Sequence, residues 1–233
     1  MSDATHDATH DPAHDEAPLS AGAALSMVRN QQRVVRTERG AFVFLISLGW
    51  GVALLVGFLA LWAVDGLKPG VSLPLPVAMT VFIILLVAAI AVSIVQGVRS
   101  GRGIRSSADA FTGTVYGVSW SVVMVAIGVL GGALRANGMS QEVANLFFPC
   151  TYALAIGLLY LIAGAIWHSV SSVVVGGWVI LVAVIAPWFG YPTHFLVLAI
   201  GVGGAFVVLA ILEALATRRV RASLTASVAV GAE

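Results

Sequence analysis

Residues 77–98 read VAMTVFIILLVAAIAVSIVQGV and contain no charged side chain. An α-helix needs about 20 consecutive apolar residues to cross the hydrocarbon core of a bilayer, which is roughly 30 Å thick. This stretch therefore predicts a membrane-spanning helix. The chain as a whole has the same character, since 59% of its 233 residues are hydrophobic and 10% are charged, against about 45–50% and about 25% in soluble domains.

Five further stretches share this composition, and together they predict an all-α polytopic membrane bundle with six transmembrane helices. The six ranges are 41–64, 77–98, 110–134, 146–167, 173–188 and 194–216. The fifth is short, but it can borrow residues 169–172 or lie in a locally thinned bilayer. Residues 146–188 cannot form a single helix, because at 1.5 Å per residue it would be about 65 Å long. The turn is expected at the polar residues 168–172.

The basic residues orient this pattern. Ten of the twelve Lys and Arg residues lie on one side of it. They are Arg29, Arg33, Arg36 and Arg39 before the first span, Arg99, Arg102 and Arg105 after the second, and Arg218, Arg219 and Arg221 after the sixth. Lys68 and Arg135 lie on the other side. Because loops rich in Lys and Arg stay in the cytoplasm, both termini are expected to face the cytoplasm, with the bundle in the plasma (inner) membrane.

The segment before the first span divides into two parts. Residues 1–18 form a low-complexity tail in which His6, His10 and His14 are each followed by Asp. Histidines at this spacing could hold a transition metal, but the composition favours a solvated, disordered tail, and neither a metal nor another cofactor is predicted. At the other end, residues 217–233 form a short basic segment followed by small residues.

Residues 19–40 are expected to form an amphipathic interfacial helix. Its apolar face holds Ala23, Ala24, Met27, Val28, Val34 and Val35, and its opposite face holds Arg29, Arg33 and Arg36. Such a helix lies with its apolar side in the acyl boundary and its guanidinium groups toward anionic headgroups. The arginine face is a candidate surface for lipid, and its alternative role is docking of a cytoplasmic partner.

One face of the third span is the main candidate functional region. Asp109, Thr112, Gly113, Tyr116, Ser119 and Trp120 fall within a narrow sector of that helix. Ser93 and Gln96 of the second span are expected beside it, with Tyr152 and Tyr160 on the fourth. This lining fits a polar pathway for an amphipathic solute. It also fits hydrogen bonding between helices, which contributes about 0.6 kcal/mol per pair in membranes, while Asp109 can cap its own helix.

The sequence contains no motif that is typical of another functional class. No charge lies near the middle of a span, and the chain has no metalloprotease, phosphate-loop, dinucleotide-binding or RNA-binding motif. The single cysteine, Cys150, lies within a span and is expected to be inert. His168 and His194 lie at opposite membrane faces and cannot converge on one metal ion. An enzyme and a nucleic-acid-binding protein are therefore not predicted.

Several segments taken together resemble a family of uncharacterised bacterial six-span membrane proteins, usually labelled hypothetical proteins or transporters. The segments are VRNQQR at 28–33, GWG at 49–51, GRGIR at 101–105, YG at 116–117, LYL at 159–161, GAIW at 164–167, GW at 177–178 and YPTH at 191–194. The resemblance covers about residues 25–213. It implies a membrane location and carries over neither a substrate nor a catalytic residue.

These observations lead to two hypotheses. The first is a transport-class protein, either a small permease or the membrane subunit of an exporter for a small or amphipathic solute. The second is a non-transporting scaffold or accessory protein that recruits a cytoplasmic partner or anionic lipid. The expected surroundings are the lipid bilayer, with a cytoplasmic partner or a second copy of the chain as candidate protein contacts.

Overall fold

The computed structural model describes residues 21–67, 72–100 and 107–230, and places the side chains of residues 42–67, 72–99 and 110–219. Every regular element within these ranges is helical. Six segments are long and apolar enough to cross a membrane. They are Phe42–Asp65, Leu75–Arg99, Ala110–Ala136, Gln141–Ile166, Val170–Phe189 and Thr193–Arg219. The predicted all-α fold with six spans is confirmed at this level.

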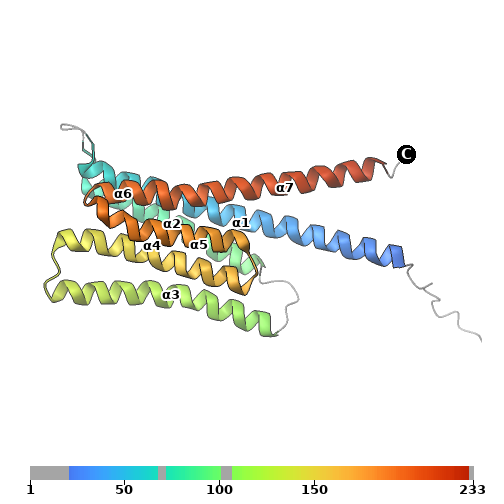
Figure 1. The fold of residues 1–233 in the computed structure, drawn as a ribbon, viewed down its shortest axis with the longest axis horizontal. Helices are drawn as coiled ribbons and strands as arrows, with labels where there is room; N and C mark the ends of the chain where they lie inside the picture. The colour runs from blue at the N-terminus through green and yellow to red at the C-terminus, as the bar shows by residue number, and fades with distance from the viewer. Residues whose placement is uncertain (1–20, 68–71, 101–106, 231–233) are drawn as a thin grey trace, which may run out of the picture.

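The helices form one elongated bundle (Figure 1). Their order is α1 (Ala21–Asp65), α2 (Leu75–Ser100), α3 (Ser107–Ala136), α4 (Gln141–Ile166), α5 (Val170–Ile185), the 3₁₀ turn η1 (Ala186–Phe189), α6 (Thr193–Leu198), the π-helical turn η2 (Ala199–Gly203) and α7 (Gly204–Val230). Together α6, η2 and α7 make up the sixth span. The start of α1 and the end of α7 extend past the other helices at the same end of the bundle, here called the terminal end; the opposite end is the distal end.

The turn between α4 and α5 lies earlier than the sequence pattern indicates. We expected it at residues 168–172, but α4 ends at Ile166 and α5 already begins at Val170. His168 takes the positive φ of 50° that ends a helix. Ser169 is the N-cap of α5, and its Oγ accepts a hydrogen bond from the Ser172 backbone N–H at 3.4 Å. The serines therefore start the fifth helix instead of separating it from the fourth.

Residues 21–65 form one continuous helix. The sequence pattern divided this stretch into an interfacial helix at 19–40 and a span from 41. Gly40 is the single Gly or Pro between Ser26 and Gly49, and an isolated glycine costs a helix only about 1 kcal/mol relative to alanine. No separate interfacial helix is thus seen in the described part of the chain, and the in-plane orientation of residues 19–40 stays a prediction. The side chains of Arg29, Arg33 and Arg36 lie outside the described residues.

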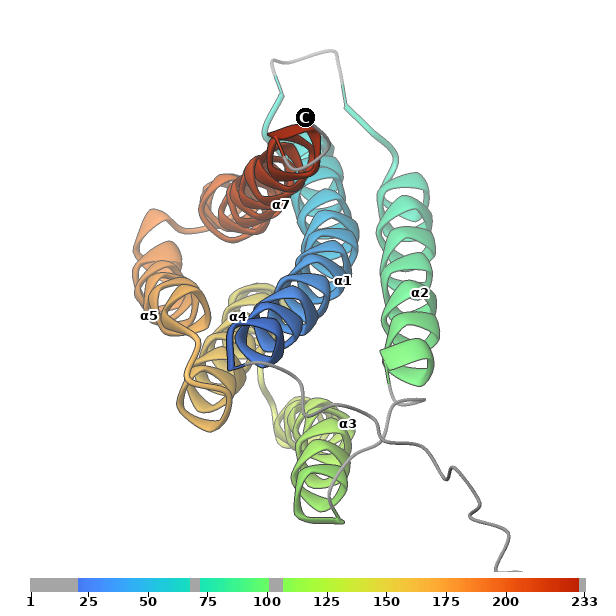
Figure 2. The ribbon, with the colours of Figure 1, turned by 90° about the vertical axis from the view of Figure 1, so that its right-hand side faces the viewer.

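The helices pack unequally (Figure 2). Helix α1 packs against α2 on one side and α7 on the other, α4 packs against α5, and α3 has its main contact with α4. The core lies between α1, α4, α5 and the sixth span. Its largest fully buried apolar side chains are Phe206, Leu198, Val179 and Val202. Helices α2 and α3 are therefore peripheral and present most of their surface outward.

Glycines set the closest helix contacts. A Cβ on Gly176 would lie 2.7 Å from the backbone N of Leu161 and 2.8 Å from the carbonyl O of Gly157. Across the α1–sixth-span contact, a Cβ on Gly203 would lie 2.5 Å from the backbone N of Leu55. Small residues allow membrane helices to approach closely, so these positions fix the α4–α5 and α1–sixth-span pairs.

Candidate functional site

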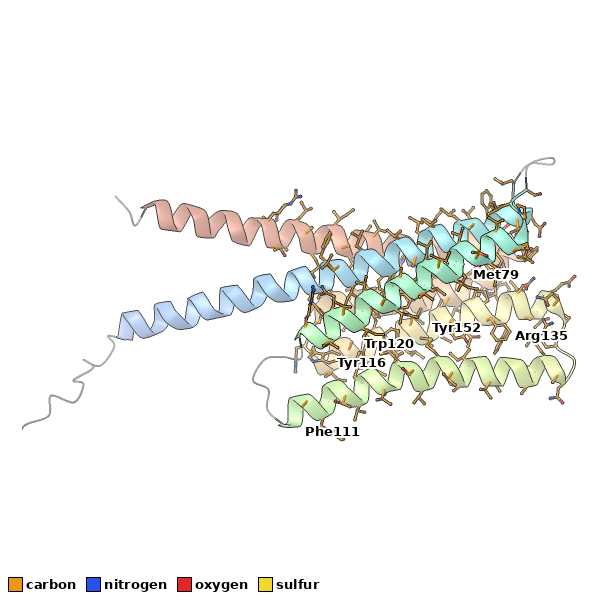
Figure 3. The ribbon with its side chains drawn as sticks, turned by 180° about the vertical axis from the view of Figure 1, so that it is seen from behind. Met79, Phe111, Tyr116, Trp120, Arg135 and Tyr152 are labelled. Carbon is orange, nitrogen blue, oxygen red and sulfur yellow. The ribbon has the colours of Figure 1, made fainter. Side chains whose placement is uncertain are left out.

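The predicted polar face of α3 turns partly toward α4. Tyr116 and Trp120 are half-buried, and Figure 3 shows them on the side of α3 that faces the bundle. Their spacing of four residues places both side chains on one face of the helix. These two residues of the predicted face therefore lie at the contact between α3 and α4.

These two side chains belong to a row of aromatic rings that crosses three helices. Trp167 at the end of α4 contacts Tyr116 edge-to-face, with ring centroids 4.7 Å apart. The row continues from Tyr116 to Trp120, whose ring centroids lie 6.2 Å apart. The next ring is that of Tyr160, with its centroid 6.1 Å from that of Trp120. The last is Phe206 of α7, with its centroid 5.0 Å from that of Tyr160. All four contacts have interplanar angles above 80°, the T-shaped geometry that aromatic pairs favour. The row begins at Trp167, which is 39% exposed, and ends at the fully buried Phe206.

Two tyrosine hydroxyls join α3 to α4. Tyr116 of α3 donates to the carbonyl O of Leu159 at 3.1 Å, and Tyr152 of α4 donates in the reverse direction to the carbonyl O of Met124 at 3.3 Å. Each bond satisfies a hydroxyl that lies among apolar side chains. Such bonds contribute about 0.6 kcal/mol each in membranes, so α3 is held chiefly by its aromatic contacts.

The residues of the predicted polar pathway do not all meet. Gln96 lies half-buried on α2, which packs against α1 and has no extensive contact with α3. Its neighbour Ser93 accepts a hydrogen bond from Trp50 Nε1 of α1 at 3.0 Å and donates to the carbonyl O of Ala89. The α2 residues therefore form a separate polar contact with α1.

The remaining pathway residues lie on α3. Thr112 is half-buried, and Ser119 donates its hydroxyl hydrogen bond to the carbonyl O of Val115 in its own helix, at 2.8 Å. Asp109 lies in the first turn of α3, and its side chain is outside the described residues. The structure thus joins Tyr116 and Trp120 to a larger aromatic group, with Thr112 and Ser119 beside it.

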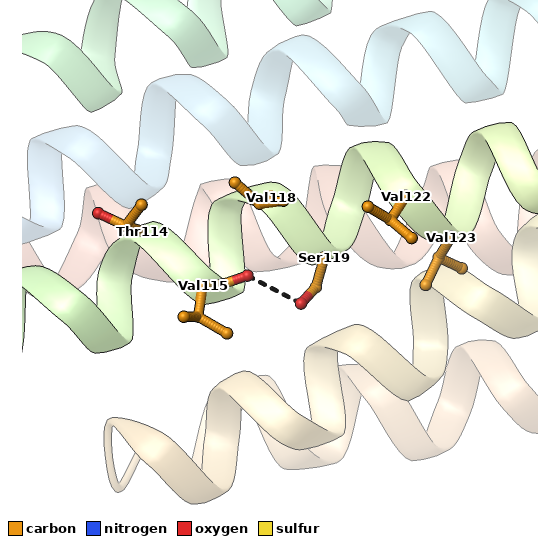
Figure 4. A pocket seen from close by; sticks show the side chains of 6 residues that line it. All are labelled: Thr114, Val115, Val118, Ser119, Val122 and Val123. Atoms are coloured by element: carbon orange, nitrogen blue, oxygen red, sulfur yellow. Dashed lines mark hydrogen bonds between the residues drawn. The ribbon is translucent and has the colours of Figure 1, made fainter.

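A shallow depression of about 310 Å³ runs along α3 (Figure 4). Its lining residues are Thr114, Val115, Val118, Ser119, Val122 and Val123. The two hydroxyls in the lining, those of Thr114 and Ser119, both bond to carbonyl groups four residues earlier. The depression is therefore apolar in effect and suits a hydrocarbon chain better than a polar group.

Comparison of the chain with protein-family models, curated proteins and solved structures gave no match. The site is therefore interpreted from its own residues, and the resemblance to six-span bacterial proteins stays a prediction.

Sequence reasoning overlooked several residues that the structure brings together. Trp167 is not among the predicted site residues, but its ring packs on that of Tyr116. Pro192 occupies the N-cap of α6, and no side chain caps that helix. His194 is fully buried at the distal end. A histidine at the start of an apolar segment, two residues after proline, was a signal for a special position, but its partners could not be read from the sequence.

No group of three or more His, Cys, Asp or Glu side chains that could hold a metal ion occurs among the described residues. Cys150 is buried. The aromatic row offers π faces and tyrosine hydroxyl groups, which are groups that can bind a ligand.

Proposed function

We propose that this protein is a transport-class membrane protein, either a small permease or the membrane subunit of an exporter, for a small or amphipathic solute. The observation that carries the proposal is the aromatic row from Trp167 to Phe206. Tyr and Trp rings combine a large apolar surface with one polar group, and a solute with apolar and polar parts can be bound along such a row.

The packing of α3 supports this proposal. Helix α3 contacts mainly α4, whereas α1, α4, α5 and the sixth span share a common core. A helix held on one side by ring contacts and two hydroxyl bonds can move away from its neighbour at lower cost than a core helix can. Such a movement would uncover Tyr116, Trp120 and Tyr160, and the rings would then alternate between packing on each other and binding solute.

We further propose that the plasma (inner) membrane holds the bundle with both chain ends in the cytoplasm. The start of α1, the end of α2 and the end of α7 all lie at the terminal end of the bundle (Figure 1). Eight of the twelve basic residues lie in these parts of the three helices, at positions 29, 33, 36, 39, 99, 218, 219 and 221. The positive-inside rule assigns this end to the cytoplasm.

Accessibility of introduced cysteines tests the transport proposal. In a Cys150→Ala background, Thr112→Cys and Ser119→Cys should react with a membrane-impermeant maleimide, because both positions adjoin the aromatic row. Val125→Cys is the matched control, since Val125 lies on the same helix and is 64% exposed on its outward side. Equal protection of all three positions from the reagent would show that no aqueous pathway follows this face, and the proposal would be wrong.

A second candidate function is a membrane scaffold that recruits a cytoplasmic partner or anionic lipid. It is favoured by the length of α1, which at 45 residues is about 68 Å long, more than twice the hydrocarbon thickness. Residues 21–41 of this helix precede the span and include Arg29, Arg33 and Arg36. The triple substitution of these arginines by Gln should abolish co-purification of a partner or flotation with anionic vesicles. Unchanged binding in both assays would eliminate the scaffold.

A further inference from the structure

The distal end of the bundle contains a buried histidine with an unusual set of partners. Among the described residues, Ser47 and His194 are the two polar side chains that are fully buried, and His194 is 0% exposed. A buried ionisable side chain in a membrane protein is expensive to keep and is expected to serve a function.

Both ring nitrogens of His194 face carbonyl oxygens. Nδ1 lies 3.2 Å from the carbonyl O of Gly190 in the turn before α6, and Nε2 lies 2.9 Å from the carbonyl O of Asn145 on α4. A neutral imidazole has one N–H and can donate one of these bonds, whereas an imidazolium donates both. In either neutral tautomer a nitrogen lone pair would face a carbonyl lone pair. The geometry is therefore complementary to the protonated ring.

The surroundings of His194 can accommodate a positive charge. The ring centroid of Phe195 lies 4.0 Å from that of the His194 ring, and the ring centroid of Tyr191 lies 6.1 Å from it. Tyr191 in turn donates a hydrogen bond to the carboxylate of Asp65 at the end of α1. The carboxylate of Asp65, the phenol of Tyr191 and the imidazole of His194 thus lie next to one another in space, in this order.

The other ionisable groups near this point are few. On α4, which contributes the carbonyl of Asn145, Glu142 is exposed and Cys150 is buried. Arg135 at the end of α3 donates to Gln141 Oε1 at 2.5 Å, and Gln141 donates to Asn145 Oδ1 at 2.7 Å. Helix α5 and η1 contain no ionisable side chain, and the charged residues of α7 lie toward the terminal end.

We propose that His194 is a proton-binding site that fastens the distal end of the bundle. A proton taken up from the distal side completes the second of the two hydrogen bonds and tightens the joint between α4, the 189–193 turn and α6. Release of that proton removes one of the two imidazole hydrogen bonds and leaves a nitrogen lone pair facing a carbonyl oxygen, and the joint loosens. This inference does not depend on the proposed transport function, because it concerns the response of the bundle to pH whether or not a solute is carried.

Nitrogen NMR of the full-length chain in lipid nanodiscs, with ¹⁵N-labelled histidine, tests the proton site directly. Between about pH 8 and pH 5, the range in which histidine commonly titrates, both ring nitrogens of His194 should move together to the signals of a doubly protonated ring. A ring that keeps one protonated and one bare nitrogen over the whole range would overturn the proposal. The signals can be identified by loss in His194→Gln. If that variant does not fold, His168→Gln and replacement of the three tail histidines identify the remaining signal by elimination.

Hydrogen exchange tests the mechanical consequence. The backbone N–H of His194 bonds to the carbonyl O of Gly190 at 2.9 Å, and that of Phe195 to the carbonyl O of Pro192 at 3.1 Å. After correction for the intrinsic pH effect, protection of these amides should fall about tenfold as the pH rises through the transition, as expected for loss of one charge-assisted bond. His194→Gln should show no such step. His168→Gln, which changes an exposed histidine at the other end of α4, should behave as the wild type. A step that persists in His194→Gln would contradict the proposal.

Discussion

Tyr191 connects two helix ends that are 126 residues apart in the sequence, because its hydroxyl donates a hydrogen bond to Asp65. Partial burial raises the pKa of this phenol from its ordinary value of 10 to about 12, and the hydrogen bond and negative charge of Asp65 act in the same direction. The phenol therefore stays protonated, and able to donate, well above neutral pH. The turn at residues 190–192, which contains the cis peptide before Pro192, is joined to the end of α1 by this hydrogen bond.

The raised pKa predicts how stability changes in alkali. A pKa that is higher in the folded than in the unfolded state stabilises the fold fully below pH 10, and this contribution disappears as the pH rises toward about 12. The free energy of unfolding of the wild type in detergent should therefore fall across this interval. In Tyr191→Phe the part of the decline due to this phenol should be absent, and the variant should be less stable than the wild type at neutral pH.

Asp65→Asn provides the control for the carboxylate. It removes the negative charge but keeps an acceptor oxygen, so the pKa of the phenol in the folded state should be lower, and the alkaline decline should be smaller and end at a lower pH than in the wild type. Identical alkaline curves for the wild type and Tyr191→Phe would mean that the Tyr191–Asp65 contact does not contribute to stability.

At the residue scale, the sequence predicted which side chains are special better than it predicted their partners. Helical periodicity placed Tyr116 and Trp120 on one face of α3, and both do belong to one aromatic row. The partner of the Tyr116 hydroxyl lies 43 residues away and that of His194 Nε2 lies 49 residues away. Such contacts depend on how the helices rotate and cross, and the pattern within one helix does not contain that information.

At the scale of elements, α4 and α5 form a close helix pair, because glycines face each other across it. A Cβ on Gly157 would lie 2.9 Å from the carbonyl O of Gly176, and a Cβ on Gly176 would lie 2.8 Å from the carbonyl O of Gly157. The atoms in contact are backbone atoms, which cannot rotate away as a side chain can. An added methyl group must therefore push the two helices apart.

The substitution Gly176→Ala should destabilise the protein by roughly 1–3 kcal/mol, the usual cost of adding atoms to a well-packed contact. The adjacent Gly177→Ala is a matched control, since a Cβ there meets nothing within 4 Å. This control should be neutral or slightly stabilising, because alanine favours the helix over glycine by up to about 1 kcal/mol. Unfolding of both variants in mixed detergent micelles measures the difference. Equal stability of the two variants would refute the close α4–α5 contact.

The same elements show what composition can and cannot predict. Length and hydrophobicity were sufficient to find all six spans, because a bilayer requires about 20 apolar residues per helix whatever the helices contact. They were not sufficient to place the turn after α4, since Ser169 and its neighbours look polar but cap and begin α5. They also gave no reason to join residues 21–40 to the first span, because the change from an amphipathic to a uniformly apolar pattern does not require a break in the backbone.

On the scale of the whole molecule, the bundle has two unlike ends. The terminal end contains the start of α1 and the end of α7, segments with seven arginines at positions 29, 33, 36, 39, 218, 219 and 221. The distal end contains the α3–α4 turn with Arg135, and the joint formed by Asp65, Tyr191 and His194. In the proposed orientation, the proposed proton site lies at the end of the bundle that faces the outside of the cell.

Labelling of cysteines in intact cells tests this orientation. In the Cys150→Ala background, Asn137→Cys lies in the exposed α3–α4 turn and should react with an impermeant maleimide added outside the cells. Thr37→Cys, between Arg36 and Arg39 in α1, should react only after the membrane is opened. The reason is electrostatic, since moving segments with several arginines across the membrane is disfavoured. If Thr37→Cys reacts in intact cells while Asn137→Cys is protected, the bundle is inverted, and His194 would then exchange its proton with the cytoplasm.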